Sequence, residues 1–168
     1  MVNTEASIVP GRSAAGFSLG QTFAEVVAQL GEVPVWSREQ PLSVAIDASP
    51  GWLQVPMSLV TNGEREGCIL FFSHGTVELK FAKSGALYEI VLAKSYPGTL
   101  LGSIGIGSKL SDVQRLITLV YDDGDEMYYP AGDENRGVAF YAVEVEVDDL
   151  DDDYEIRVIS VHDWSMNH

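Results

Sequence analysis

The chain has few of the features that stabilise small proteins outside a hydrophobic core or attach proteins to membranes. Its 168 residues include one cysteine, Cys68, which excludes an internal disulfide framework and fits a reducing compartment. No run of about 18 or more apolar residues is present, so we expect no membrane-spanning helix. The N-terminal sequence MVNTEASIVPGRSAAG lacks the basic start and apolar stretch of a secretory signal. These absences predict a cytoplasmic protein without membrane contact.

Basic residues are also scarce. The sequence has 10 Lys and Arg against 25 Asp and Glu, which gives a formal net charge of −15. Such a charge repels nucleic acid and anionic lipid, because the phosphate contacts that dominate nucleic-acid affinity become unfavourable. We therefore expect no nucleic-acid partner. The same charge speeds encounter with a basic protein, although a role in solubility alone explains it equally well.

Residues arranged for catalysis or metal binding are few. His74, His162 and His168 lack the spacing of zinc ligands, so no metal site is predicted. Cys68 lies in the apolar run GCILFF and is interpreted as a core or strand residue rather than a nucleophile. The glycines of residues 102–107 (GSIGIG) lack the lysine of a phosphate-binding loop. The sequence thus predicts neither catalytic residues nor a cofactor.

What the chain does contain is a pair of similar segments, each of which predicts a helix. Residues 18–33 align with residues 105–120 at an offset of 87, and the identical pairs are Gly20/Gly107, Val26/Val113 and Val33/Val120. Apolar residues with helical spacing are Phe23, Val26, Val27 and Leu30 in the first segment and Leu110, Val113, Ile117 and Val120 in the second. Thr22 and Glu25 predict a capping box for the first helix, and Ser108 or Ser111 is the expected cap of the second.

Strand-like runs follow each predicted helix. After the first they are residues 41–48, 52–60, 67–73, 76–82 and 86–93, and after the second they are residues 126–130, 137–147 and 154–164. The last run of each set carries the tripeptide Tyr-Glu-Ile, at residues 88–90 and 154–156. This order favours a duplication. We predict an α+β fold of two tandem units, each a helix followed by an antiparallel β-meander. The two units are expected to pack as one compact domain, in which they can share one continuous sheet.

The predicted units are residues 18–98 and 99–168, preceded by a lead-in segment of residues 1–17. The pattern around the first helix resembles the opening of BamE/SmpA-type lipoprotein domains, whose fold is shared with the tandem β-lactamase-inhibitory protein. The matching residues are Leu19, Gly20, Thr22, Glu25, Val26, Leu30, Gly31 and, shifted by one, Pro34, and in the second copy Ile106, Gly107, Asp112, Val113 and Ile117. The chain departs from these families in having no lipidation cysteine near its start. The resemblance implies a scaffold that binds proteins with its sheet surface and has no catalytic residues.

The sharpest surface features are two acidic clusters. With Tyr128, they are predicted to form a partner-binding surface of Asp122, Asp123, Asp125, Glu126, Tyr128, Glu144, Glu146, Asp148, Asp149, Asp151, Asp152 and Asp153. Alternation with valines places the two glutamates of residues 143–147 on the solvent side of their strand. Solvated loops and a calcium site are the other interpretations, but YDDGDEMYY lacks the ligand spacing of an EF-hand loop.

Taken together, these features favour a non-enzymatic inhibitor, and in particular an immunity protein that neutralises a basic toxin such as a nuclease effector through an acidic face. Three alternatives remain open. The first is an enzyme or small-molecule-binding domain with a cavity between the units, which His74 or Cys68 beside acidic residues would support. The second is a BamE-like assembly or adaptor module, and the third is a calcium-stabilised domain.

Overall fold

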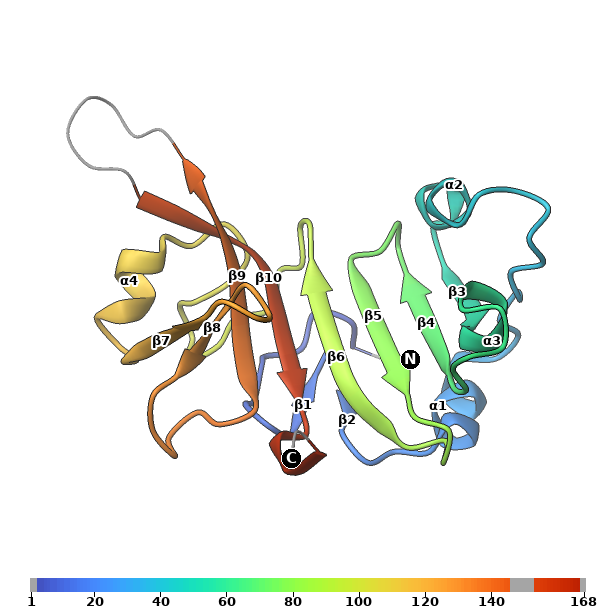
Figure 1. Cartoon of the computed structure of the whole chain (residues 1–168), viewed down its shortest axis with the longest axis horizontal. Helices are drawn as coiled ribbons and strands as arrows, with labels where there is room; N and C mark the ends of the chain where they lie inside the picture. Colours follow the sequence, from blue (N-terminus) through green and yellow to red (C-terminus); the bar gives the residue numbers. More distant parts are fainter. Residues whose placement is uncertain (1–2, 146–152, 167–168) are drawn as a thin grey trace.

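The computed structural model describes residues 3–145 and 153–166, and its main feature is one antiparallel sheet of eight strands (Figure 1). The strand order is β3-β4-β5-β6-β10-β9-β8-β7. Their bounds are β3 Trp52–Pro56, β4 Cys68–Phe72, β5 Val77–Phe81, β6 Leu87–Ala93, β7 Leu119–Asp122, β8 Met127–Pro130, β9 Val138–Val145 and β10 Asp153–His162. The predicted α+β class and the single continuous sheet are confirmed.

Two four-stranded meanders make up this sheet, β3 to β6 and β7 to β10, and they meet through their last strands. β6 and β10 pair antiparallel from Glu89–His162 to Ala93–Val158, with Val91 opposite Ser160 at the centre. Side chains alternate between the two faces of a strand, so this register decides which residues of the two meanders share a face.

The first predicted helix is confirmed as α1, Phe23–Leu30. Its capping box forms as expected: the Glu25 backbone N–H donates to Thr22 Oγ1 at 3.2 Å, and the Thr22 N–H donates to Glu25 Oε2 at 2.7 Å. The helix ends at Gly31, which has a positive φ of 80° that favours glycine. No helix in the described part of the chain is long and apolar enough to cross a membrane.

The second predicted helix is much shorter than its apolar spacing suggested. Helix α4 spans Leu110–Gln114, and Val120 belongs to strand β7 instead. The β-branched residues after Leu116 favour extended backbone, and pairing with β8 supplies their hydrogen bonds. The predicted serine caps are also wrong, because Lys109 is the N-cap and Ser108 Oγ accepts from the Gly105 N–H.

Two strand predictions in the first meander need correction. Residues 41–48 form helix α2, Leu42–Ala48, rather than a strand, because Leu42, Ala45 and Ile46 fall at helical spacing and pack on Leu53 and Phe71. The predicted strand 52–60 ends at Pro56 and continues as helix α3, Met57–Val60. The remaining predicted strands correspond to β4, β5, β6, β8, β9 and β10 within the described residues.

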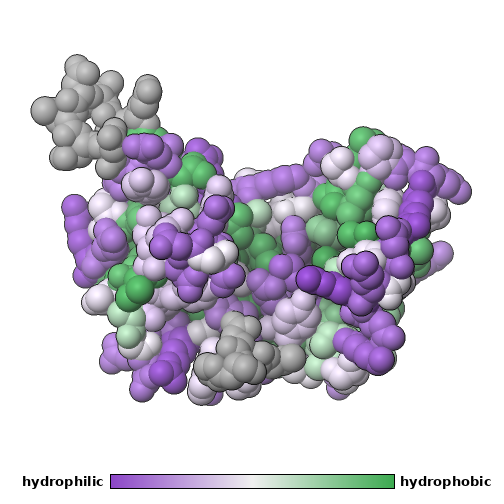
Figure 2. Space-filling view, in the orientation of Figure 1, coloured by the Kyte–Doolittle hydropathy of each residue, from purple (hydrophilic) through white to green (hydrophobic). Residues whose placement is uncertain are grey.

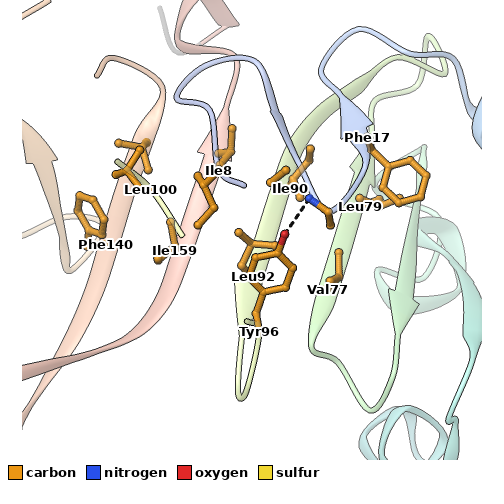
Figure 3. Packing of buried hydrophobic residues seen from close by; sticks show 14 of the residues in the cluster. Ile8, Phe17, Val77, Leu79, Ile90, Leu92, Tyr96, Leu100, Phe140 and Ile159 are labelled. Atoms are coloured by element: carbon orange, nitrogen blue, oxygen red, sulfur yellow. Dashed lines mark hydrogen bonds between the residues drawn. The ribbon is translucent and has the colours of Figure 1, made fainter. Parts of the chain in front are cut away.

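One face of the sheet, here called the packed face, is covered by the N-terminal segment and by α1 and α4. Ile8, Ala14, Ala15 and Phe17 are buried against the middle strands, and the short hairpin of β1 (Ser13–Ala14) and β2 (Phe17–Ser18) crosses them (Figure 3). The Ala15 N–H donates to the Tyr96 hydroxyl at 3.0 Å. The lead-in segment therefore contributes part of the core.

On the opposite face, here called the open face, a helix packs over β3 and β4. There α2 and Trp36 pack on Leu53, Val55, Ile69 and Phe71 as a separate small core. Figure 2 shows hydrophilic and hydrophobic residues interspersed on the open face, with one hydrophobic group at the upper right where α2 lies in Figure 1. The middle strands of the open face present polar side chains together with apolar residues such as Val91 and Val158.

Candidate functional site

The middle of the open face carries a row of polar residues on neighbouring strands. Lys80 on β5 lies opposite Glu89 on β6, and Glu89 lies opposite His162 on β10. The next row contains Glu78 and Ser160, on either side of Val91. Alternation places all of these side chains on the face opposite the N-terminal segment.

Glu89 is the centre of this polar network. Its Oε2 accepts from Lys80 Nζ at 2.8 Å, and its Oε1 accepts from Ser160 Oγ at 2.8 Å. Ser160 is 3% exposed and the Glu89 side chain 22%, so the network is largely shielded from water. Burial alone would lower the pKa of Lys80, but the Glu89 carboxylate beside it raises that pKa overall. The two carboxylate oxygens of Glu89 are therefore engaged.

A cavity of about 280 Å³ adjoins this network at the junction of β6 and β10. Its lining comes from both meanders and consists of Tyr88, Glu89, Asp125, Met127, Tyr129, Ser160, His162 and Asp163. The Asp163 N–H donates to the Tyr88 carbonyl at 2.9 Å, which extends the β6–β10 pairing along the cavity wall. The cavity is thus built on β6, β8 and β10, apart from Asp125 in a turn and Asp163 directly after β10.

The turn between β7 and β8 brings Asp125 to the cavity. Asp122 Oδ1 accepts from the N–H groups of Gly124, at 2.8 Å, and Asp125, at 3.2 Å, which tightens the turn. The Tyr129 hydroxyl donates to Asp125 Oδ2 at 2.8 Å and holds that carboxylate in place. In Figure 1 this hairpin reaches over β9 and β10 toward the middle of the sheet.

The aromatic and ionisable groups around the cavity influence one another. The rings of Tyr129 and His162 meet edge to face, with centroids 6.0 Å apart. Burial lowers the pKa of His162, although the carboxylates of Glu89, Asp163 and Asp125 oppose this shift. Burial and the hydrogen bond to Asp125 raise the pKa of the Tyr129 hydroxyl. At neutral pH both rings are therefore uncharged.

Glu78 lies beside the network on β5. Burial raises the pKa of its carboxyl; Lys80 opposes this shift and Glu89 reinforces it. No hydrogen bond reaches the Glu78 side chain from any residue within the described ranges 3–145 and 153–166. This carboxylate is the least compensated charge of the polar rows.

The acidic surface predicted from the sequence is divided in the structure. Asp122, Asp123, Asp125 and Glu126 share the exposed β7–β8 segment, but of these only Asp125 lines the cavity. Tyr128 lies on the packed side of β8, opposite Phe140, and its ring is 4.8 Å from that of Tyr121.

The remaining predicted residues belong to β9 and β10 and the segment between them. Glu144 is exposed near the end of β9, and Asp153 at the start of β10 accepts from Ser111 Oγ at 2.7 Å. Asp153 and Tyr128 line a second hollow beside α4. Glu146, Asp148, Asp149, Asp151 and Asp152 lie outside the described residues.

Sequence reasoning missed most of the cavity, including Glu89, Ser160, His162 and Asp163. A signal was present: Glu89 and Ser160 each lie between apolar residues, Glu89 before Ile90-Val91-Leu92 and Ser160 between Ile159 and Val161. The sequence does not say which strands are neighbours, so the two polar interruptions could not be recognised as partners.

Cys68 and His74, the residues named for a catalytic alternative, do not line this cavity. Cys68 lies in β4, as predicted, and burial raises the pKa of its thiol to about 11. The His74 ring contacts the Asp47 carbonyl beside α2, with Nδ1 2.6 Å from the oxygen. Among the residues that the structure describes, no group of three or more His, Cys, Asp or Glu side chains is arranged to hold a metal ion.

Comparisons with protein-family models, curated proteins and solved structures found no match to this chain. The resemblance to BamE/SmpA-type domains therefore stays a prediction from the sequence.

Proposed function

We propose that this chain is a non-enzymatic inhibitor that binds a basic protein with the open face of its sheet, in the manner of an immunity protein that masks a toxin. The observation that carries this proposal is the uncovered middle of the open face, where carboxylates outnumber cations around the cavity. Glu89, Asp125 and Asp163 line it, and Lys80 already pairs with Glu89.

Charge complementarity decides the kind of partner. An acidic surface on a chain of net charge −15 attracts a basic surface and repels an acidic one. Hydrogen bonds from Tyr129 and Ser165 hold Asp125 and Asp163 in position before binding, so less ordering entropy is lost on association. A toxin that binds nucleic acid presents such a basic surface, and covering it would block its substrate.

We also propose that the two meanders are tandem copies. Two hydrogen bonds of the first half recur in the second half. The residues before the helix that form them differ by 87 positions, the offset found in the sequence. The Gly20 N–H donates to the Leu87 carbonyl, at 2.8 Å, and the Leu87 N–H to the Gln21 carbonyl, at 2.9 Å. In the second half, Gly107 and Ser108 contact Ile156 in the same way, at 2.8 and 2.9 Å.

The register of β6 and β10 supports the same conclusion. If Leu87 corresponds to Ile156, then Val91 corresponds to Ser160, and these two residues are directly opposite one another. The copies are then related by an approximate twofold axis through that pair. This alignment has an offset of 69 (156 − 87), so the Tyr-Glu-Ile tripeptides, which differ by 66 (154 − 88), are not equivalent. A tandem scaffold accords with the inhibitor role that the resemblance implies.

The test uses the tagged full chain, a variant with Asp125→Lys and Asp163→Lys on the open face, and a matched control with Glu32→Lys and Glu39→Lys. The control acids are exposed and lie outside the cavity lining. Proteins of the native host are captured at low salt, identified, and purified. Their activity is then assayed with each form of the chain.

We expect one basic protein to be retained by the wild type and by the control, released by salt, and inhibited at equal molar amounts. The open-face variant should lose both retention and inhibition. Equal inhibition by all three forms would contradict the proposed surface, and capture without inhibition would contradict the inhibitor role.

A small-molecule-binding protein is the second candidate, and the cavity of about 280 Å³ at the β6–β10 junction favours it. A metabolite screen by thermal shift distinguishes the two functions. Stabilisation that Asp163→Lys abolishes, without any protein partner, would replace the inhibitor proposal with this one.

A further inference from the structure

We propose that the cavity at the β6–β10 junction binds one arginine side chain of the partner, with its guanidinium between the carboxylates of Asp125 and Asp163 and against the ring of Tyr129. This inference rests on the proposed function and specifies the contact through which the open face recognises its partner.

The charges around the cavity are not balanced. Glu89 is paired with Lys80, at 2.8 Å. Asp125 accepts from the Tyr129 hydroxyl, and Asp163 accepts from the backbone N–H and hydroxyl of Ser165, at 3.0 and 2.6 Å; all of these donors are neutral. Within the described residues, no Lys or Arg forms an ion pair with Asp125 or Asp163. The exposed Asp125 and the half-buried Asp163 therefore place two negative charges on one hollow, which a cation would stabilise.

The walls of the cavity suit a guanidinium better than a compact ammonium. Tyr88 and Tyr129 supply aromatic faces, on which a planar guanidinium stacks favourably. Met127 supplies an apolar surface for the arginine stem. A guanidinium also presents several N–H donors in one plane and can reach two carboxylates together.

The geometry is held in place before any ligand binds. The hydrogen bond from the Tyr129 hydroxyl to Asp125 fixes both the ring and the carboxylate. Ser160 and Lys80 fix Glu89 behind them. A site fixed in this way loses little conformational entropy on binding.

The cavity also has a defined place along the junction. On one side of the central Val91–Ser160 pair, β6 and β10 bring Glu89 opposite His162; on the other side, they bring Ala93 opposite Val158. The polar pair therefore stands at one end of an otherwise symmetric register.

The first experiment titrates ¹⁵N-labelled full chain with the peptide Gly-Gly-Arg-Gly-Gly, blocked at both ends, and with the same peptide carrying neutral citrulline. We expect the arginine peptide to shift the amide resonances of Met127, Tyr129, His162 and Asp163, with a dissociation constant of roughly 1 mM, as is ordinary for one side chain. The citrulline peptide should shift none of them. Equal shifts with both peptides would overturn the proposal.

Two matched variants locate the site. Asp163→Asn and Asp123→Asn each remove one carboxylate charge, but Asp163 lines the cavity and Asp123 does not. The charged contact predicts about tenfold weaker peptide binding for Asp163→Asn and no change for Asp123→Asn. Equal weakening by both would show a diffuse charge effect and overturn the proposal. Both amide spectra establish that the variants are folded.

A third arm identifies the source of the guanidinium. Free arginine is compared with the blocked peptide, in which no charged α-amino or carboxylate group remains. Binding of the peptide at least as tight as that of the free amino acid supports a protein side chain. Much tighter binding of free arginine would assign the cavity to a small molecule and overturn the side-chain assignment. If the peptide does not bind, but inhibition of a partner still depends on Asp125 and Asp163, this inference alone is rejected. The proposed function then stands.

Discussion

The two faces of the central strands are made by alternating residues of the same segments, and they are stabilised in different ways. On β6, Ile90 is buried beneath the N-terminal segment, whereas its neighbour Glu89 is held by Lys80 on the open face. On β10, Ile159 and Ser160 alternate in the same way. The packed face excludes water through apolar contact, and the open face depends on hydrogen bonds and ion pairs.

This difference teaches that a substitution's effect depends on the face on which the side chain lies more than on its position in the sequence. On the packed face the dominant contribution to stability is burial of apolar surface. On the open face each ionic contact offsets its own desolvation, so its net contribution is small. Four predictions follow this contrast, from the largest effect to the smallest.

Phe140→Ala should have the largest effect. Phe140 is fully buried on the packed face, and its removal leaves a cavity that the paired strands cannot close, so we expect a loss of about 3–5 kcal/mol in the free energy of unfolding. Tyr141→Ala is the control: Tyr141 is the next residue on β9, is 37% exposed, and should cost less than about 1 kcal/mol. Urea unfolding measures both, and equal losses would contradict the contrast between the faces.

Tyr96→Phe removes the hydroxyl that ties the N-terminal segment to the packed face. Its oxygen accepts from the buried Ala15 N–H and its hydroxyl donates to the Ala6 carbonyl. An unsatisfied buried N–H predicts a loss of about 2 kcal/mol and faster hydrogen exchange at Ala15. Tyr88→Phe on the open face should change stability by less than about 0.5 kcal/mol. Unchanged exchange at Ala15 would show that this hydroxyl does not hold the segment.

Lys80→Met tests the ionic network of the open face. The substitution leaves the partly buried Glu89 carboxylate without its cation, which should cost about 1 kcal/mol. Adding Glu89→Leu should recover part of this loss, because the carboxylate that lost its cation is then removed. A double-mutant cycle with urea unfolding gives the coupling energy. A coupling near zero would mean that the pair contributes nothing to stability.

Glu78→Gln should stabilise the protein slightly, by at most about 1 kcal/mol at pH 7. Burial raises the pKa of Glu78, so the native state binds this proton more tightly than the unfolded chain does, and ionisation above that pKa destabilises the fold. The gain should shrink as the pH falls below the native pKa, where Glu78 is protonated. Thermal melts at several pH values measure it, with exposed Glu39→Gln as control. A gain that is independent of pH would rule out this electrostatic cause.

Much of the local structure could be predicted from short stretches of sequence. The capping box of Thr22 and Glu25 and the alternation in β5 depend on residues a few positions apart, so they are visible without the fold. Helix α2 was missed because its apolar residues suit a strand as well as a helix, and packing on Leu53 and Phe71 decided between them. The end of α4 was missed for the same kind of reason, since pairing with β8 overrides the helical spacing of Val120.

The candidate site was less predictable. Its acidic character was evident, and Asp125 was named among the acidic residues. Glu89 and His162, however, are 73 positions apart in the chain (162 − 89), and Asp163 follows His162 directly. No local pattern shows that β6 pairs with β10 or that the β7–β8 turn reaches the same place.

The sequence by itself determined the strand alternation, the first helix with its cap, the strong acidity and the α+β class, because each depends on composition or on neighbouring residues. Only the tertiary structure decided which face each polar residue shares, and with whom. The pairing of β6 with β10 places Ser160 and His162 beside Glu89, and the register of that pairing is set by hydrophobic contacts on the opposite face, between residues far apart in the chain.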